Sequence, residues 1–200
     1  MTGATATPSM PRVVVFAGPN GAGKSTHAEI ILDALGIGTF VNADHIARGL
    51  SGRNTDSVAL EAGRIMLNRL RDLANERSDF AFESTLSSRT FAPLLRRWKS
   101  QGYSVAIYYF SLSSPQLAVR RVRLRVALGG HDVPADVVQR RYARSLHNFL
   151  TLYIPLADEW TLFDNSQPGK ARQVASFIAS QFSTTEPSLW NKLLKYKTGP

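Results

Sequence analysis

The chain has 200 residues, enough for one domain with a full hydrophobic core. Its 44% hydrophobic content argues against overall disorder, and the absence of cysteine excludes disulfides and cysteine-ligated zinc. No apolar run approaches the ~20 residues needed to cross a bilayer, and the N-terminus lacks the apolar stretch of a secretion signal, so we expect a cytoplasmic protein. The net charge of +9 is compatible with nucleic acids, nucleotides or phosphorylated substrates as ligands.

Apolar runs and helical periodicities alternate along the chain. Apolar runs predict five strands, at Arg12–Ala17, 39–42, Asp79–Glu83, Tyr103–Phe110 and Trp160–Phe163. Amphipathic patterns and capping residues predict helices over 24–35, 57–77, 89–100, 115–129, 134–152 and 170–182. Because strands alternate with helices, the chain is expected to form an α/β fold with a parallel sheet covered on both faces.

The first predicted strand runs into a segment that fits the phosphate-binding loop pattern GxxxxGK[ST]. Its glycines let backbone N–H groups curl toward phosphate oxygens, and the following helix adds its positive dipole end. Lys24 is predicted to reach the β- and γ-phosphates of ATP, and the Ser25 hydroxyl to bind Mg²⁺. The predicted nucleotide-binding residues are Gly18, Pro19, Asn20, Gly21, Ala22, Gly23, Lys24, Ser25 and Thr26, with Asp164 and Asn165 after the fifth strand.

The loop in this context predicts a P-loop NTPase with about five mostly parallel strands, helices on both faces and a helical lid. We expect a flexible leader over 1–11, one domain over 12–182 with its lid at about 120–145, and a tail over 183–200. In such folds ligands bind beyond the C-terminal ends of the strands. The loop, Asp44, Glu83 and Asp164 all fall at those ends.

Two carboxylates are candidates for the chemistry. Asp44 follows the second predicted strand, where it can accept a hydroxyl proton as a general base or orient Mg²⁺. As an alternative, which can coexist with catalysis, Asp44 caps a short helix over 45–50. Glu83 ends the third strand and can hold a substrate hydroxyl or a Mg²⁺-bound water, or it can form a salt bridge with Arg89. Thr85, Ser87 and Ser88 supply hydroxyls nearby.

Arginines supply the candidate cations. Seven of them crowd the predicted lid: Arg120, Arg121, Arg123, Arg125, Arg140, Arg141 and Arg144.

Two lid arginines, Arg121 and Arg125, lie four residues apart on one helical face, so that one can stack on adenine and the other can meet phosphates. Arg141 lies on the returning helix. The glycine pair at 129–130 is expected to act as a hinge, and His131 beside it to bind phosphate or substrate unless it is merely solvated. Alternatively, some arginines only cover apolar surface.

Several functional classes compete. A transporter-type ATPase is disfavoured because residues 50–52 read Leu-Ser-Gly but Arg53 and Asn54 break the LSGGQ signature, and the strand over 103–110 ends without an acid. No guanine-recognition motif of a GTPase appears. A small-molecule kinase fits best, because phosphoryl transfer needs positioned phosphates, cations and a base. A nucleic-acid-binding or end-processing protein and a non-catalytic ATP-binding regulator are the alternatives.

The residues 18–26, 40–44, 82–87 and 129–134, with 140–142, together resemble the zeta-toxin family of phosphate-loop kinases. The resemblance implies ATP- and Mg²⁺-dependent phosphorylation of a sugar hydroxyl of UDP-N-acetylglucosamine, and a small antitoxin partner. It implies that Lys24 binds phosphate, that Asp44 is the base and that Glu83 and Thr85 lie near the substrate. The best-known toxins carry an arginine where this chain has His131, so the second lid cation is expected to be Arg140 or Arg141.

Overall fold

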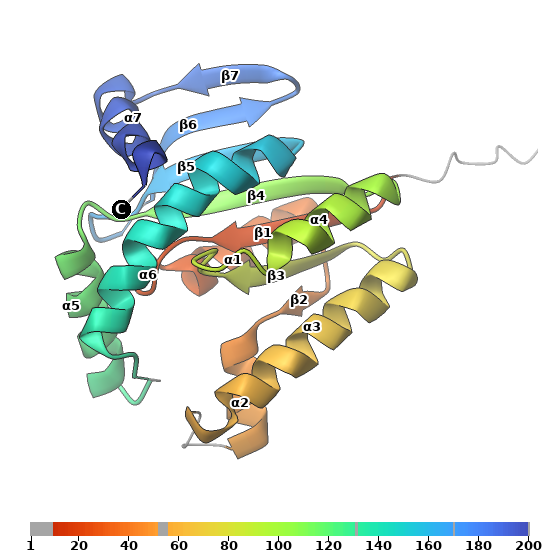
Figure 1. Cartoon of the computed structure of the whole chain (residues 1–200), viewed down its shortest axis with the longest axis horizontal. Helices are drawn as coiled ribbons and strands as arrows, with labels where there is room; N and C mark the ends of the chain where they lie inside the picture. Colours follow the sequence, from red (N-terminus) through yellow and green to blue (C-terminus); the bar gives the residue numbers. More distant parts are fainter. Residues whose placement is uncertain (1–9, 52–55, 131, 170, 200) are drawn as a thin grey trace, which may run out of the picture.

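The computed structural model describes residues 10–51, 56–130, 132–169 and 171–199, and these residues form one sheet covered by helices (Figure 1). In this part of the chain seven strands pair in the order β2-β3-β1-β4-β5-β6-β7. The strands are β1 (Arg12–Ala17), β2 (Phe40–Val41), β3 (Phe80–Ser84), β4 (Ser104–Ser111), β5 (Glu159–Asp164), β6 (Arg172–Ile178) and β7 (Gln181–Thr184). The first five run parallel, as predicted, and the last two extend the sheet as antiparallel strands.

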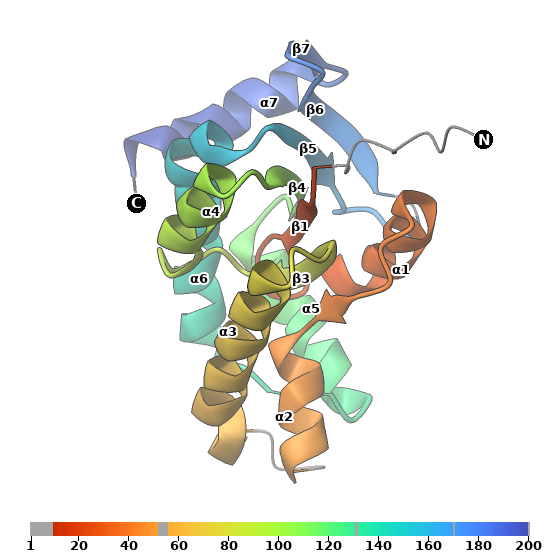
Figure 2. The ribbon, with the colours of Figure 1, turned by 90° about the vertical axis from the view of Figure 1, so that its right-hand side faces the viewer.

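Helices cover both faces of the sheet. The α-helices are α1 (Lys24–Leu35), α2 (Ala43–Ser51), α3 (Ala59–Asn75), α4 (Phe91–Ser100), α5 (Pro115–Ala127), α6 (Ala135–Asn148) and α7 (Pro187–Leu194). Because side chains alternate along a strand, Val14 and Phe16 pack with α1 and α5, whereas Val13 and Val15 pack with α3, α4 and the end of α6. Figure 2 shows α1 on one side of β1 and α4 and α6 on the other.

Short helical turns join these elements. They are η1 (Asp56–Val58), the π-helical turn η2 (Phe149–Tyr153), η3 (Ile154–Leu156) and η4 (Lys195–Thr198). No helix in the described ranges is both long and apolar enough to cross a membrane.

The C-terminal part differs from the prediction. The helix predicted over 170–182 is wrong, because this segment forms β6, a tight turn and the start of β7. Ala179 and Ser180 form the turn with φ of 50° and 62°. Such two-residue turns usually carry asparagine or glycine, so Ala179 and Ser180 carry no turn signal. Pairing with β5, a contact made only in the folded chain, prevails over the local helical pattern.

The structure bears on both expected ends of the domain. Of the leader expected over 1–11, residues 1–9 lie outside the described residues. The boundary expected at 182 falls within β7. Beyond it, Trp190 of α7 stacks on Trp160 of β5, with ring centroids 5.7 Å apart. The tail thus packs on the sheet at β5.

Candidate active site

The segment between β1 and α1 has the conformation that a phosphate-binding loop requires. Gly18, Gly21 and Gly23 have φ of 136°, 76° and 80°, a region that side chains with a Cβ rarely adopt. At Gly18 a Cβ would lie 2.2 Å from the main-chain oxygen of Phe110, so only glycine fits there. The Asn165 amide donates to the Ala22 oxygen at 2.8 Å and fixes the loop from behind.

Lys24 and Ser25, at the start of α1, both contact Glu83. The Lys24 ammonium lies 3.5 Å from Glu83 Oε1 and donates to the Pro19 oxygen at 3.1 Å, and its side chain is 6% exposed. The Ser25 hydroxyl donates to Glu83 Oε2 at 2.5 Å, and the Asn42 amide donates to the same oxygen at 3.0 Å. Glu83 therefore lies beside the phosphate loop and contacts both Lys24 and Ser25.

Asp44 lies in the first turn of α2, at the edge of the same cavity. Its backbone N–H donates to Asn42 Oδ1 at 2.8 Å, so Asn42 caps the helix and the capping role considered for Asp44 is wrong. The Asp44 carboxylate is half-exposed and lies 4.0 Å from the Arg125 guanidinium. Its side chain is therefore available for chemistry at the cavity.

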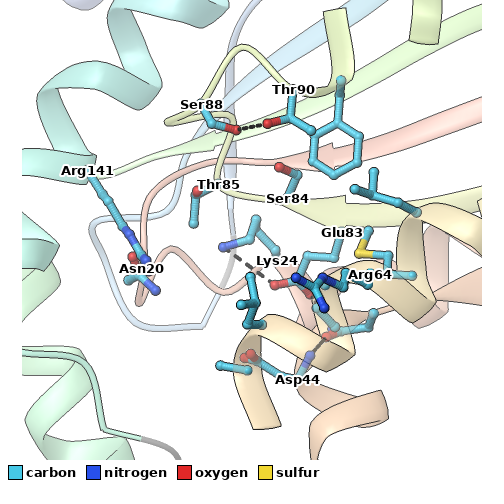
Figure 3. Close-up of a pocket in the computed structure, with 18 of the residues that line it drawn as sticks. Asn20, Lys24, Asp44, Arg64, Glu83, Ser84, Thr85, Ser88, Thr90 and Arg141 are labelled. Carbon is cyan, nitrogen blue, oxygen red and sulfur yellow. Dashed lines mark hydrogen bonds and ion pairs between the residues drawn. The ribbon is translucent and has the colours of Figure 1, made fainter. Parts of the chain in front are cut away.

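The predicted lid arginines separate into two groups. Arg125 of α5 and Arg141 of α6 line the cavity, and Figure 3 shows Arg141 reaching toward Asn20 of the phosphate loop. Arg121 instead donates to the main-chain oxygens of Gly21 and Ser166, at 3.5 and 3.1 Å, and so supports the loop from outside. The remaining lid arginines, Arg120, Arg123, Arg140 and Arg144, do not line this cavity.

The cavity has a volume of about 410 Å³ and lies between the phosphate loop, α2, α3 and the segment after β3. Sequence reasoning missed the whole wall supplied by α3, which consists of Ala59, Leu60, Gly63, Arg64, Met66 and Leu67. The spacing of Leu60, Arg64 and Leu67 marks a second stripe on this helix, next to the apolar face used for packing. That stripe was the available signal.

Residues 84–90, which we call the hydroxyl loop, form the opposite wall. Four of its hydroxyl side chains line the cavity: Ser84, Thr85, Ser88 and Thr90. They bond with their neighbours, because Thr85 Oγ1 and Ser87 Oγ lie 2.8 Å apart and Ser88 donates to Thr90 at 3.1 Å (Figure 3). Of these four, Thr85 was predicted as a substrate-binding residue and Ser88 as a nearby hydroxyl.

The structure thus brings together around one cavity most of the predicted catalytic and substrate residues and part of the predicted nucleotide-binding loop. The predicted residues that line it are Asn20, Gly21, Lys24, Asp44, Glu83, Thr85, Arg125 and Arg141.

Other predicted residues lie around this cavity rather than on it. Asp164 pairs with Arg172 at 3.2 Å and does not line the cavity. Among the described residues no group of three histidines or acids is arranged to hold a metal on its own. His131 lies outside the described residues.

The parallel sheet, the glycine loop between β1 and α1, and a cavity beyond the strand ends define a P-loop NTPase fold. The chain belongs to the AAA domain family, whose model matches residues 13–149. Over 131 residues it is 29% identical to an uncharacterized protein of Haemophilus influenzae, covering 66% of this chain and 92% of that protein.

Solved structures share this fold at low identity. The crystal structure of AvrRxo1-ORF1:-ORF2 with ATP matches with a TM-score of 0.77 at 17% identity, over 95% of this chain. The present chain spans 65% of the length of that AvrRxo1 chain. A structure from the PezAT chromosomal toxin-antitoxin system of Streptococcus pneumoniae matches with a TM-score of 0.62 at 14% identity, over 100% of this chain and 83% of that one.

Proposed function

We propose that this protein is an ATP-dependent kinase that transfers the γ-phosphate to a hydroxyl of a small molecule. The observation that supports this best is the arrangement around the cavity, which has the phosphate loop on one side and a half-exposed aspartate with a row of hydroxyl side chains on the other. A hydrolase needs only water there, whereas a cavity of about 410 Å³ has room for an organic acceptor.

The phosphate loop is suited to a triphosphate. Its left-handed glycines turn N–H groups inward, and the buried Lys24 supplies a cation that Glu83 holds in the absence of phosphate. Ser25 at the start of α1 and Glu83 beside it would hold Mg²⁺, which neutralises charge on the phosphates when bound. Arg125 and Arg141 would cover the transferred group from the lid, where such cations can contribute ~10³–10⁵ in rate.

The acceptor hydroxyl would lie between Lys24 and Asp44. Asp44 would accept its proton as the oxygen attacks the γ-phosphorus, and the bond from that phosphorus to the β–γ bridging oxygen would break. The Asn20 amide oxygen is buried and has no hydrogen-bond partner in the described part of the chain, so a donor on a ligand would satisfy it. Glu83 and Thr85 would help to orient the acceptor.

The α3 wall and the hydroxyl loop favour an anionic acceptor with a hydroxyl-rich part. Arg64 is an exposed cation on the α3 wall, and Figure 3 shows it across the cavity from Arg141. A nucleotide sugar such as UDP-N-acetylglucosamine has both features. It is also the acceptor implied by the resemblance to zeta toxins. The names of the AvrRxo1 and PezAT neighbours describe a two-protein complex and a toxin-antitoxin system, which supports a small antitoxin partner here as well.

The test is an incubation of the purified protein with ATP, Mg²⁺ and a panel of nucleotide sugars, sugar acids and neutral sugars. We expect one acceptor class to gain a single phosphate, detected by mass analysis, in step with ADP release. Normal ATP binding with no phosphorylated acceptor, in the panel or in cell extracts after brief induction, would contradict the kinase. It would favour a non-catalytic ATP-binding regulator instead.

A further inference from the structure

Side chains of α6 and of the π-helical turn η2 hold the hydroxyl loop through hydrogen bonds. Three of their side chains donate to backbone carbonyls of the loop. Ser145 Oγ donates to Thr85 O, Asn148 Nδ2 donates to Leu86 O at 2.8 Å and the Tyr153 hydroxyl donates to Ser88 O at 2.9 Å. The two of these loop residues that line the cavity, Thr85 and Ser88, are thus each bonded to this support.

The donor residues of these three bonds are buried. Ser145 and Tyr153 are 0% exposed and Asn148 is 6% exposed, so water does not readily replace a lost bond. The single hydrogen of the Ser145 hydroxyl goes to the loop, so Tyr109 must donate to Ser145 Oγ, at 2.8 Å. Burial raises the pKa of Tyr153 to about 12, which keeps its hydroxyl protonated as a donor at neutral pH.

The loop also has a conformation that needs outside support. Leu86 has φ of 52°, a left-handed value that costs roughly 1–2 kcal/mol for a residue with a Cβ. Its N–H is satisfied by Ser84 Oγ at 3.0 Å and its carbonyl by Asn148. Without these contacts the strained turn would relax and its neighbours' hydroxyls would move.

The same helix carries a lid arginine. Arg141 lies one turn before Ser145 on α6, so a single rigid element reaches into the cavity with one side chain and fixes its hydroxyl wall with another. We propose that Ser145, Asn148 and Tyr153 are positioning residues that set the hydroxyls of Thr85 and Ser88 in register with Arg141, so that they determine acceptor affinity. This inference rests on the proposed kinase function.

The test uses two matched tyrosines. Tyr153→Phe removes the hydroxyl that donates to Ser88 O and that also contacts the backbone of Phe91 and Ala92. Tyr142→Phe removes an equally buried hydroxyl on α6, which donates to Leu112 O at 2.5 Å, away from the cavity. Because each variant loses a hydroxyl that donates to a backbone carbonyl, losses in thermal stability of the same order are expected. We expect Tyr153→Phe to raise the acceptor KM about tenfold with ATP affinity unchanged, and Tyr142→Phe to alter neither.

Ser145→Ala is the second variant, and the same rise in acceptor KM is expected from it. Equal acceptor KM values in Tyr153→Phe, Ser145→Ala and the Tyr142→Phe control would overturn the positioning role. So would a loss of ATP affinity that matches the loss of acceptor affinity, because a merely structural defect would affect both ligands. Failure of the proposed function is a different outcome, since the unaltered protein would then transfer phosphate to no acceptor.

Discussion

Replacing Glu83 by glutamine removes the charge that balances Lys24 in the empty phosphate loop. At 3.5 Å and an effective dielectric constant of about 20, their attraction amounts to about 5 kcal/mol. Desolvation of both groups offsets much of this, but a buried ammonium left without its partner remains costly. We therefore expect Glu83→Gln to lower the free energy of unfolding by about 2 kcal/mol, and Tm by roughly 4–8 °C for a chain of this length.

The matched control is Glu76→Gln. Glu76 pairs with Arg69 at a similar distance, 3.6 Å, but both side chains are about half-exposed, so we expect a change below about 1 kcal/mol.

The second measurement is ATP affinity without metal. Because Glu83 competes with phosphate for Lys24, Glu83→Gln should bind ATP in EDTA about tenfold more tightly than the unaltered protein. Thermal unfolding and isothermal titration calorimetry measure the two effects. Equal Tm losses in Glu83→Gln and Glu76→Gln, or unchanged metal-free ATP affinity, would refute the view that Glu83 holds Lys24 ready for phosphate.

Three further outcomes are expected. Gly18→Ala should lower the free energy of unfolding by more than about 3 kcal/mol, because the added Cβ would lie 2.2 Å from a main-chain oxygen. The control, Gly36→Ala, has open space around it and should lower this free energy by only about 1–2 kcal/mol. Chemical denaturation measures both. Arg64→Ala should raise the KM of an anionic acceptor about 10- to 100-fold, and Arg71→Ala on the same helix, outside the cavity, should not. Because the pKa of Tyr153 is raised in the folded protein, its hydroxyl contributes stability below pH 10 that is lost as the pH rises toward about 12. The free energy of unfolding of Tyr153→Phe should therefore depend less on pH in that range than that of the unaltered protein.

The phosphate-loop half of the site could be predicted from sequence because its chemistry depends on local backbone geometry. Glycines at fixed spacing between a buried strand and a helix specify a loop whose glycines adopt positive φ. The helix α1 begins at Lys24, as expected. The positions of Asp44 and Glu83 followed from the rule that parallel strands present their C-terminal ends at one edge. Their partners did not follow, since nothing local links Glu83 to Lys24 rather than to Arg89.

The acceptor half could not be predicted, because side chains from distant segments form it. Arg64 and Leu67 share a stripe on an amphipathic helix, but that stripe faces a cavity only once α3 packs opposite the hydroxyl loop. Arg121 and Arg125 share a helical face by spacing, yet only Arg125 lines the cavity. The hairpin of β6 and β7 could not be predicted either, because pairing with β5 rather than the propensity of its own residues determines its strands.

We propose that Asp44 accepts the proton of a hydroxyl attacking ATP in this cavity. The most direct measurement is single-turnover transfer of label from the γ-phosphate to the acceptor by Asp44→Asn, beside Asp136→Asn, an exposed carboxylate on α6 that lies outside the cavity. We expect Asp44→Asn to lose roughly 10²–10⁴-fold in rate while its ATP affinity stays that of the unaltered protein, and Asp136→Asn to keep full rate. Transfer by Asp44→Asn at the rate of the control would contradict the claim.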